Sequence, residues 1–287
     1  MTRPLIFAVA ICASALPAAA QQTFTGRLSD NRCGVSHQPK AGGLSDRECL
    51  FACVNSLANY VLVDPDGRVV PIVNQDAIGL PLYAGRPVKL TGERTGDGVV
   101  VTKVEAIPAH LHVGHVMTNW RDTPGLRGFL PVAIDEARVA LLHARLAAKS
   151  ASLDEAKLHA GHALNALDPA VEPKGPSGPG AGYGIRKAVA GAIQHLDFAA
   201  RGEGATPSIT THAASASSSL SAALRLVDEA VAAAQRIRAA TEPAAAAAAA
   251  AELAALTGEI SGTELQDAQA HLAAMLKAEG FAGAPRD

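Results

Sequence analysis

The side chains best suited to chemistry in this sequence are its histidines, of which there are ten. Three of them fall in the stretch HLHVGHVMTNW at positions 110–120. A neutral imidazole binds Zn, Cu, Fe or Ni through a ring nitrogen, so histidines that share one surface predict a transition-metal site. The sequence lacks the C-x-x-C-H signature of covalent haem attachment, so any haem would be held non-covalently, as a b-type haem.

Each of three predicted helices places one histidine on or beside its apolar face. These are His143 in 130–149, His195 in 182–200 and His212 in 208–240. Glu136 shares the face of His143, two helical turns earlier. Burying several imidazoles without partners is costly, so we predict these four residues as the inner ligands of a metal or haem site.

Two further pairs of histidines have i, i+3 spacing and form a second group of candidate ligands. They are His112 with His115, and His159 with His162. Side chains three residues apart lie on the same helix face, so both imidazoles of a pair can reach one ion. Each pair lies away from the apolar face of its helix and requires a covering helix to become a site. Met117 lies on the apolar face and is predicted to pack rather than to act as an axial ligand.

The cysteines form another constellation, because Cys33, His37, Cys49 and Cys53 have the spacing C-x3-H-x11-C-x3-C. Three thiolates and an imidazole are a ligand set of structural zinc sites. The alternative, which we favour, is a disulfide from Cys33 to Cys49 or to Cys53 that leaves one thiol over. Export to an oxidising compartment favours the disulfide, and the remaining thiol keeps the metal site open.

Residues 23–107 carry the pattern of a small β-domain. Five strand-like runs are separated by turn signals such as Asp66-Gly67 and the segment 95–98, and a short helix is predicted at 46–57. One sheet of this size must curl to bury a core, so the pattern predicts a small closed or half-closed barrel.

Several short motifs of this segment carry a resemblance. They are GRLSDNRC (26–33), C-x-x-x-C (49–53), YVLVD (60–64) and GRPVKLTG (85–92). Together they resemble the small OB-like β-barrels of exported bacterial proteins. The resemblance covers roughly a third of the chain and implies a fold rather than an activity.

After Pro108 the apolar period becomes helical. Helices are predicted at 109–120, 130–149, 152–167, 182–200, 208–240, 244–257 and 263–278, with capping boxes at Ser152-x-x-Glu155 and Thr263-x-x-Gln266. The glycine-rich link at 175–187 is predicted to be a flexible connection, although its amides could hold an anion. The fold class is therefore α+β: an OB-like five-stranded barrel at 21–108, an alanine-rich antiparallel helical bundle at 109–280, and a disordered tail at 281–287.

The remaining sequence features concern location and excluded classes. Residues 1–20 have the pattern of a signal peptide, which predicts a periplasmic or secreted protein with no membrane insertion after cleavage. A net charge of −2 without a basic cluster predicts no nucleic-acid partner. The nucleophile motif G-x-S-x-G is missing, and Glu136 is the only convincing general base, so the sequence favours a protein that is not an enzyme.

These patterns lead to one expected function and one main alternative. The bundle is expected to bind a transition metal (Zn, Cu or Fe) or a b-type haem, for metal handling or electron transfer. The alternative is a non-catalytic module with a protein partner in the cell envelope, in which the histidines hydrogen-bond within the bundle. A metal-dependent hydrolase is a weaker third possibility.

Overall fold

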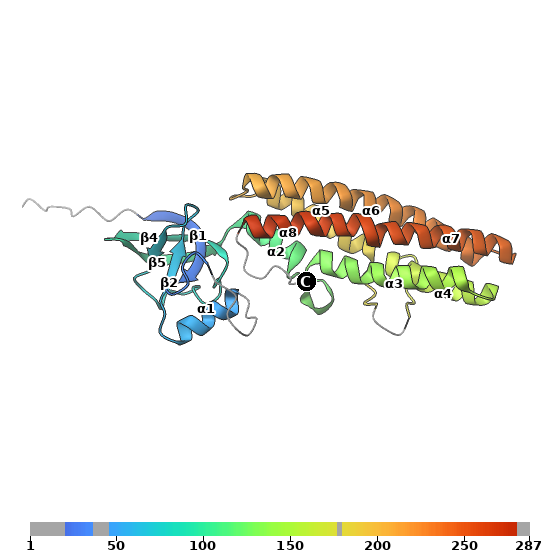
Figure 1. The fold of residues 1–287 in the computed structure, drawn as a ribbon, viewed down its shortest axis with the longest axis horizontal. Coiled ribbons are helices and arrows are strands. Elements are labelled where there is room, and N and C mark those ends of the chain that lie inside the picture. Colours follow the sequence, from blue (N-terminus) through green and yellow to red (C-terminus); the bar gives the residue numbers. More distant parts are fainter. Residues whose placement is uncertain (1–20, 37–45, 177–179, 280–287) are drawn as a thin grey trace, which may run out of the picture.

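The computed structural model describes residues 21–36, 46–176 and 180–279. An N-terminal sheet domain is followed by an elongated helical domain, and the chain passes from one to the other at Ile107 (Figure 1). The α+β organisation and its order along the chain are as the sequence predicts. His37 and the predicted signal peptide and tail lie outside the described residues.

The N-terminal domain is one antiparallel sheet with the strand order β3-β2-β1-β4-β5. The strands are β1 (Gln22–Asp30), β2 (Tyr60–Val63), β3 (Val69–Pro71), β4 (Pro87–Thr95) and β5 (Gly98–Ala106). Both predicted hairpins form, and Gly67 and Gly96 occupy their turns with φ of 80° and 60°. A positive φ favours glycine, which is the turn chemistry that the sequence indicates.

The predicted barrel is corrected by the structure, because the sheet does not close. Just after edge strand β3, Ile72 forms one isolated bridge with Val99 of edge strand β5, and the Val73 N–H donates to the Val99 carbonyl at 2.9 Å. Strand β3 has only 3 residues, whereas β5 has 9, so β3 cannot provide the continuous ladder that closure requires. The sheet curls around its core and remains open.

Helix α1 (Asp46–Asn55) covers this sheet. Its Leu50 is fully buried in the sheet's apolar core, which is worth roughly 1.5–3 kcal/mol for a side chain of this size. Arg47 adds a polar anchor, because its guanidinium donates to the carbonyls of Pro81, Leu82 and Ala84 at 3.3, 3.3 and 2.8 Å. The helix that carries Cys49 and Cys53 is therefore held in place independently of the cysteines.

The predicted helices of the second domain all form, with ends shifted by a few residues. They are α2 (Pro108–Met117), α3 (Phe129–Lys149), α4 (Leu153–Leu167), α5 (Ile185–Arg201), α6 (Pro207–Ala239), α7 (Pro243–Glu259) and α8 (Leu265–Ala278). The Ser152 cap is confirmed, since its hydroxyl accepts from the Glu155 N–H at 3.2 Å. The predicted cap at Thr263 is wrong. A π-helical turn, Ile260–Glu264, instead carries α7 directly into α8, so no helix start needs capping there.

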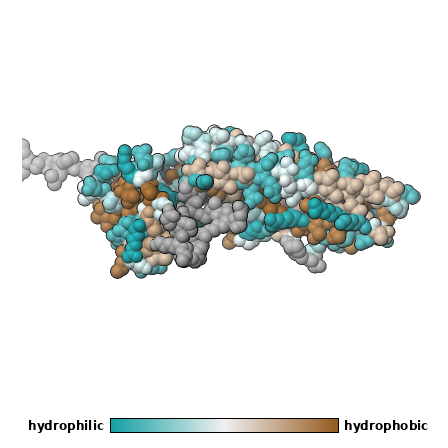
Figure 2. Space-filling view, in the orientation of Figure 1, coloured by the Kyte–Doolittle hydropathy of each residue, from teal (hydrophilic) through white to brown (hydrophobic). Residues whose placement is uncertain are grey.

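Small side chains allow these helices to pack closely. The core of the bundle is rich in buried alanines, among them Ala137, Ala140, Ala192, Ala223 and Ala234. Figure 2 shows polar and apolar residues interleaved on the face in view, with a weakly apolar area at the end of the bundle where alanine-rich α7 lies. Among the described helices, none combines the length and the apolar character needed to span a bilayer.

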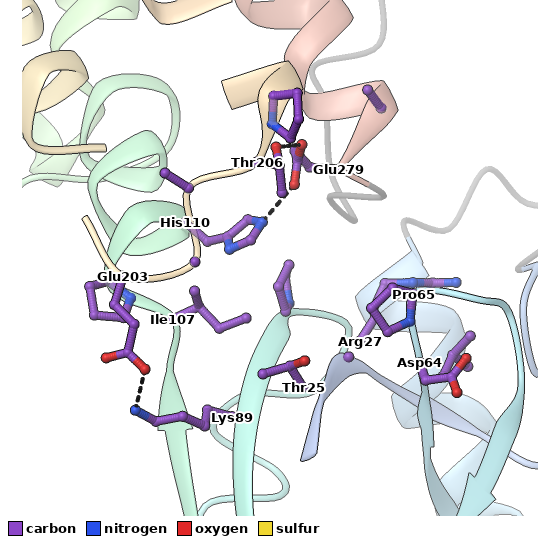
Figure 3. Close-up of a pocket in the computed structure, with 18 residues that line it drawn as sticks. Thr25, Arg27, Asp64, Pro65, Lys89, Ile107, His110, Glu203, Thr206 and Glu279 are labelled. Atoms are coloured by element: carbon purple, nitrogen blue, oxygen red, sulfur yellow. Dashed lines mark hydrogen bonds and ion pairs between the residues drawn. The ribbon is translucent and has the colours of Figure 1, made fainter. Parts of the chain in front are cut away.

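The two domains meet around a cavity of about 760 Å³ (Figure 3). On one side, Lys89 of β4 forms an ion pair with Glu203 at 2.8 Å. On the other, His110 Nε2 lies 2.9 Å from Glu279 Oε2. Burial alone would raise the pKa of Glu279, but hydrogen bonds from His110 and Thr206 outweigh it and lower the pKa overall. These contacts join the sheet, the loop before α6 and the end of α8.

Candidate metal centres

Three imidazoles from two helices converge at the first candidate site, which we call the α2–α5 centre. His112 and His115 lie one turn apart on α2, and His195 faces them from α5. The Nδ1 atom of His195 lies 2.9 Å from Nδ1 of His112 and 3.2 Å from Nδ1 of His115. Helix α5 therefore supplies the covering face that the α2 pair requires, together with a third nitrogen.

These separations suit one bound ion. With metal–nitrogen bonds of 2.0–2.1 Å and tetrahedral angles, two ligand nitrogens lie about 3.3 Å apart. One ligand atom from each of the three histidines lies within 4.8 Å of the others. A small contraction or expansion of the cluster would therefore bring all three nitrogens to bonding distance of a common point.

The imidazoles of this centre are held in the neutral form that binds metals. Desolvation, followed by repulsion from His115 and His112, lowers the pKa of His195 to about 4. Desolvation also lowers the pKa of His112 and of His115. A metal ligand must be deprotonated, so at neutral pH no proton has to be displaced before an ion binds.

An aromatic wall surrounds His195. Trp120 lies 4.7 Å from the His195 ring and 4.6 Å from that of His115, measured between ring centroids, and Phe129 lies 5.3 Å from His195. His195 itself is only 6% exposed. These rings leave His195 little exposed to solvent, which strengthens any charge interaction at its ring.

Gly191 allows Phe129 to lie against the backbone of α5, because a Cβ at this position would meet the Phe129 ring at 2.4 Å. Alanine normally stabilises a helix interior by about 0.8–1 kcal/mol relative to glycine. We expect Gly191→Ala to reverse that sign and destabilise the protein by roughly 1–3 kcal/mol, because the ring must move. Gly161→Ala on α4 is the matched control, since its Cβ would meet nothing within 4 Å. The measurement is the denaturant midpoint of each variant relative to the wild type. Equal stabilisation by both substitutions would contradict the expectation.

A second cluster, which we call the α3–α4 centre, lies on the antiparallel pair formed by α3 and α4. His143 of α3 faces His159 and His162 of α4, with Nδ1 of His143 3.1 Å from Nδ1 of His159. The ring centroids of His143 and His162 are 4.7 Å apart. Again, one ligand atom from each of the three residues lies within 4.8 Å of the others.

Two of the imidazoles of the α3–α4 centre, those of His143 and His162, have a lowered pKa. Desolvation, followed by repulsion from His162 and His159, lowers the pKa of His143 to about 4. Desolvation also lowers the pKa of His162. Nδ1 of His162 is buried and has no hydrogen-bond partner among the described residues, a state that costs about 1–3 kcal/mol and that a metal bond would relieve.

The structure combines the histidines differently from the sequence prediction. His143 and His195 were predicted to share one site with His212, but each instead joins an i, i+3 pair of the second predicted group. His212 of α6 faces His271 of α8, with 3.4 Å between their Nδ1 atoms. A position on the apolar face of a helix shows that a side chain points into the bundle. This bundle has several helix–helix interfaces, and the pairing of the helices decides at which interface the side chain lies.

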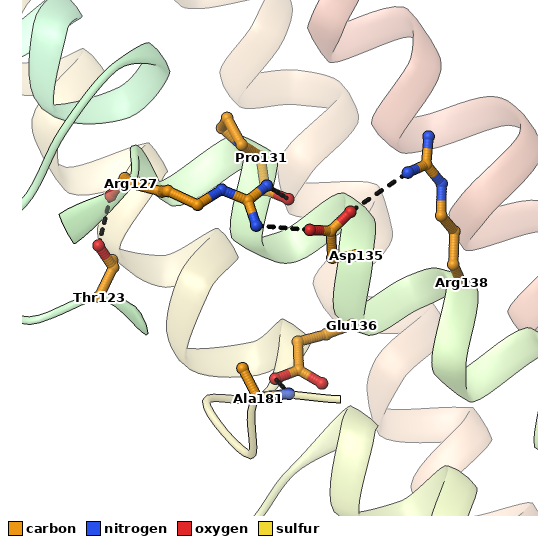
Figure 4. Close-up of polar contacts among 7 residues, drawn as sticks. All are labelled: Thr123, Arg127, Pro131, Asp135, Glu136, Arg138 and Ala181. Carbon is orange, nitrogen blue, oxygen red and sulfur yellow. Dashed lines mark hydrogen bonds and ion pairs between the residues drawn. The ribbon is translucent and has the colours of Figure 1, made fainter. Parts of the chain in front are cut away.

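Glu136 lies outside both centres and has a different partner (Figure 4). It is 1% exposed, and its Oε1 accepts from the N–H groups of Ala181 and Tyr183 at 3.2 and 2.9 Å. The glycine-rich link therefore does present its amides to an anion, and that anion is the protein's own carboxylate. Neighbouring Asp135 points to the other side of α3, toward Arg127 and Arg138.

The cysteines provide a third cluster, in the sheet domain. Sγ of Cys33 lies 4.0 Å from Sγ of Cys49 and 3.9 Å from Sγ of Cys53, and all three thiols are free. A disulfide needs about 2.05 Å, so the predicted disulfide is absent among the described residues. Cys33 is nearly equidistant from its two possible partners. Burial, and then the nearby Asp30 carboxylate, raise the pKa of the Cys33 thiol to about 12.

Together, the three clusters define a chain with several places at which nitrogen or sulfur donors converge. No protein-family model, curated protein or solved structure matches the chain. The donor geometry of the clusters is therefore the basis for the function proposed below.

Proposed function

We propose that the helical domain binds two transition-metal ions, one at the α2–α5 centre and one at the α3–α4 centre, and that the protein serves in metal handling. The observation that carries this proposal is the convergence of three imidazoles, one ligand atom each within 4.8 Å, at two separate places in one bundle. Each centre combines a pair from one helix with a single histidine from its neighbour.

A purely hydrogen-bonded interior explains the α2–α5 centre poorly. A neutral imidazole nitrogen carries either one hydrogen or one lone pair. Nδ1 of His195 faces two other Nδ1 atoms, at 2.9 and 3.2 Å, so only one of the two contacts can be a proper hydrogen bond at a time. A cation at the common point would satisfy all three nitrogens together.

The geometry also favours an ion over haem. Two axial ligands of a haem iron lie on opposite faces of a flat macrocycle, roughly 4 Å apart given metal–nitrogen bonds of about 2 Å. The closest nitrogen pairs here are 2.9 and 3.1 Å apart and belong to clusters of three. That arrangement matches three ligands on one side of an ion.

Three protein ligands leave a coordination position open on a four-coordinate ion, as in sites that exchange a ligand rather than in closed structural sites. Imidazole donors suit Zn(II) and Cu(II), and affinity for divalent ions peaks at Cu(II). An open, imidazole-lined site fits reversible uptake and release. The predicted signal peptide would place this activity in the periplasm or outside the cell, where an envelope protein could receive the ion.

The test is the number of ions bound by protein equilibrated with Zn(II) and measured by mass spectrometry of the metal. His195→Ala and His143→Ala should each lower the bound metal by one equivalent, and the double variant by two. His212→Ala is the matched control and should bind as much as the wild type. Equal metal content in the wild type, the two single variants and the double variant would overturn the proposal and favour a module whose histidines only hydrogen-bond.

A further inference from the structure

Three thiols converge where α1 packs against the end of β1. Cys49 and Cys53 are one turn apart on α1, and Cys33 follows β1 in the turn that faces the helix. Cys49 and Cys53 are 4% and 5% exposed, and Cys33 is half-buried. The cluster is therefore shielded on the helix side and reachable from solvent on the side of Cys33.

The turn that carries Cys33 is held by contacts that do not involve sulfur. The Asp30 carboxylate accepts from the N–H groups of Arg32 and Cys33 at 2.9 and 3.0 Å. The Arg32 guanidinium donates to the carbonyl of Ser56, just beyond the end of α1. The turn and the helix are thus joined by contacts that do not depend on a bond between the sulfur atoms.

The size of the sulfur triangle matches a metal ion. Its two measured edges are 4.0 and 3.9 Å, and its third is at most 4.8 Å. For a third edge between about 3.9 and 4.8 Å, the point equidistant from the sulfurs lies about 2.3–2.5 Å from each, close to a zinc–thiolate bond of about 2.3 Å. The same edges are nearly twice the length of a disulfide bond.

We propose that Cys33, Cys49 and Cys53 bind one thiophilic d10 ion, Zn(II) or Cu(I), at a site separate from the two histidine centres. Binding forms three metal–sulfur bonds and releases the three thiol protons to solvent. Soft thiolate ligands select these ions, whereas imidazoles also accept harder divalent ions. The chain would then carry two chemically different kinds of metal site, one in each domain. The thiolate site would also fasten α1 to the end of β1.

The test uses the reduced wild-type protein under anaerobic conditions, titrated with Zn(II) and with Cu(I) against chromophoric chelators. Each cysteine is then read individually by alkylation and peptide mass spectrometry. We expect one ion to protect Cys33, Cys49 and Cys53 together, and the ion that protects at the lower free concentration identifies the preferred metal. Cys33→Ser should weaken this binding at least about 100-fold, because even the loss of an outer-shell partner costs roughly 10–100-fold.

Two controls separate this proposal from the proposed function and from misfolding. The double variant His143→Ala/His195→Ala should keep full protection of the three thiols even if it loses the histidine-bound ions. Protection in the wild type is itself independent of any substitution, so an unfolded Cys33→Ser variant leaves the test intact. Unchanged alkylation of all three thiols with either ion, or a disulfide among them in freshly isolated protein, would overturn the proposal.

Discussion

Cu(II) added to the wild-type protein should quench the fluorescence of Trp120, and His195→Ala should lose that response. Trp120 is the only tryptophan in the sequence, and its ring contacts those of His115 and His195 at centroid distances of 4.6 and 4.7 Å. A paramagnetic ion at the α2–α5 centre would therefore lie beside the indole. The fluorescence of Trp120 thus reports on ion binding at this centre, because the indole lies next to two of its histidines.

The expected size of the effect follows from ligand number. Losing an outer-shell partner of a metal ligand costs roughly 10–100-fold in affinity, so losing one of three direct ligands should cost at least about 100-fold. At Cu(II) concentrations that saturate the wild type, His195→Ala should show little site-specific quenching. A titration of Trp120 emission against free Cu(II) gives both affinities.

His112→Ala is the second variant, because His195 is buried against Phe129 and its truncation also disturbs packing. His112 is half-buried, so its truncation disturbs the packing of the aromatic rings around His195 less. His143→Ala should leave the quenching curve unchanged, since it belongs to the α3–α4 centre. Wild-type quenching in both His195→Ala and His112→Ala would show that no ion binds at the α2–α5 centre.

The parts of this molecule that sequence could predict are those set by local rules. Helical period, the Ser152 cap and the hairpin glycines placed the elements to within a few residues. The i, i+3 spacing of His112 with His115 and of His159 with His162 identified both pairs that the structure brings to a third histidine. Each of these features depends on residues within one or two turns of each other.

The parts that could not be predicted depend on which elements meet. His195 and His143 both point inward, yet one faces α2 and the other α4, and no pattern within a single helix encodes that choice. Barrel closure failed because β3 has only 3 residues, a length that depends on how far β2 and β3 pair. The disulfide prediction assumed that oxidising conditions decide the cysteine state, whereas the sulfur separations fit an ion.

Glu136 is a second residue whose direction the sequence could predict but whose contacts it could not. Its inward direction was predictable, but its partner is the amide pair of Ala181 and Tyr183, from a link whose path the sequence leaves open. A buried carboxylate accepting two amides fixes the loop that precedes α5, the helix that carries His195. Glu136 thus holds the loop that leads into α5 and lies outside the cluster of His112, His115 and His195.

The second large effect concerns pH, because metal-free protein should lose stability as pH falls from about 6.5 toward about 4. The pKa of His143 and the pKa of His195 are each lowered to about 4, mainly by desolvation and further by the neighbouring imidazoles. In the unfolded chain a histidine titrates near 6.5. Below that pH, the two histidines bind protons in the unfolded chain but stay neutral in the folded protein.

The sign of the effect follows from proton linkage. Stability rises with pH wherever the unfolded state binds more protons, so these two groups contribute fully above about pH 6.5 and lose their contribution as pH approaches 4. One pKa unit corresponds to about 1.4 kcal/mol. His195 is almost completely buried and His143 only half-buried, so solvent screening reduces the share of His143. Together they should supply a few kcal/mol of pH dependence.

Urea denaturation of chelator-treated protein between about pH 7 and about pH 4.5 measures this dependence. Carboxylates titrate in part of the same range, so the informative quantity is the difference between the wild type and His143→Ala/His195→Ala. The double variant should have the flatter profile, because its unfolded state takes up two fewer protons. Bound metal should steepen the wild-type profile, since protons then also compete with the ion for the imidazoles. Parallel profiles for wild type and double variant would show that the two imidazoles take up protons in the folded protein at the same pH as in the unfolded chain, so that their pKa is not lowered by folding.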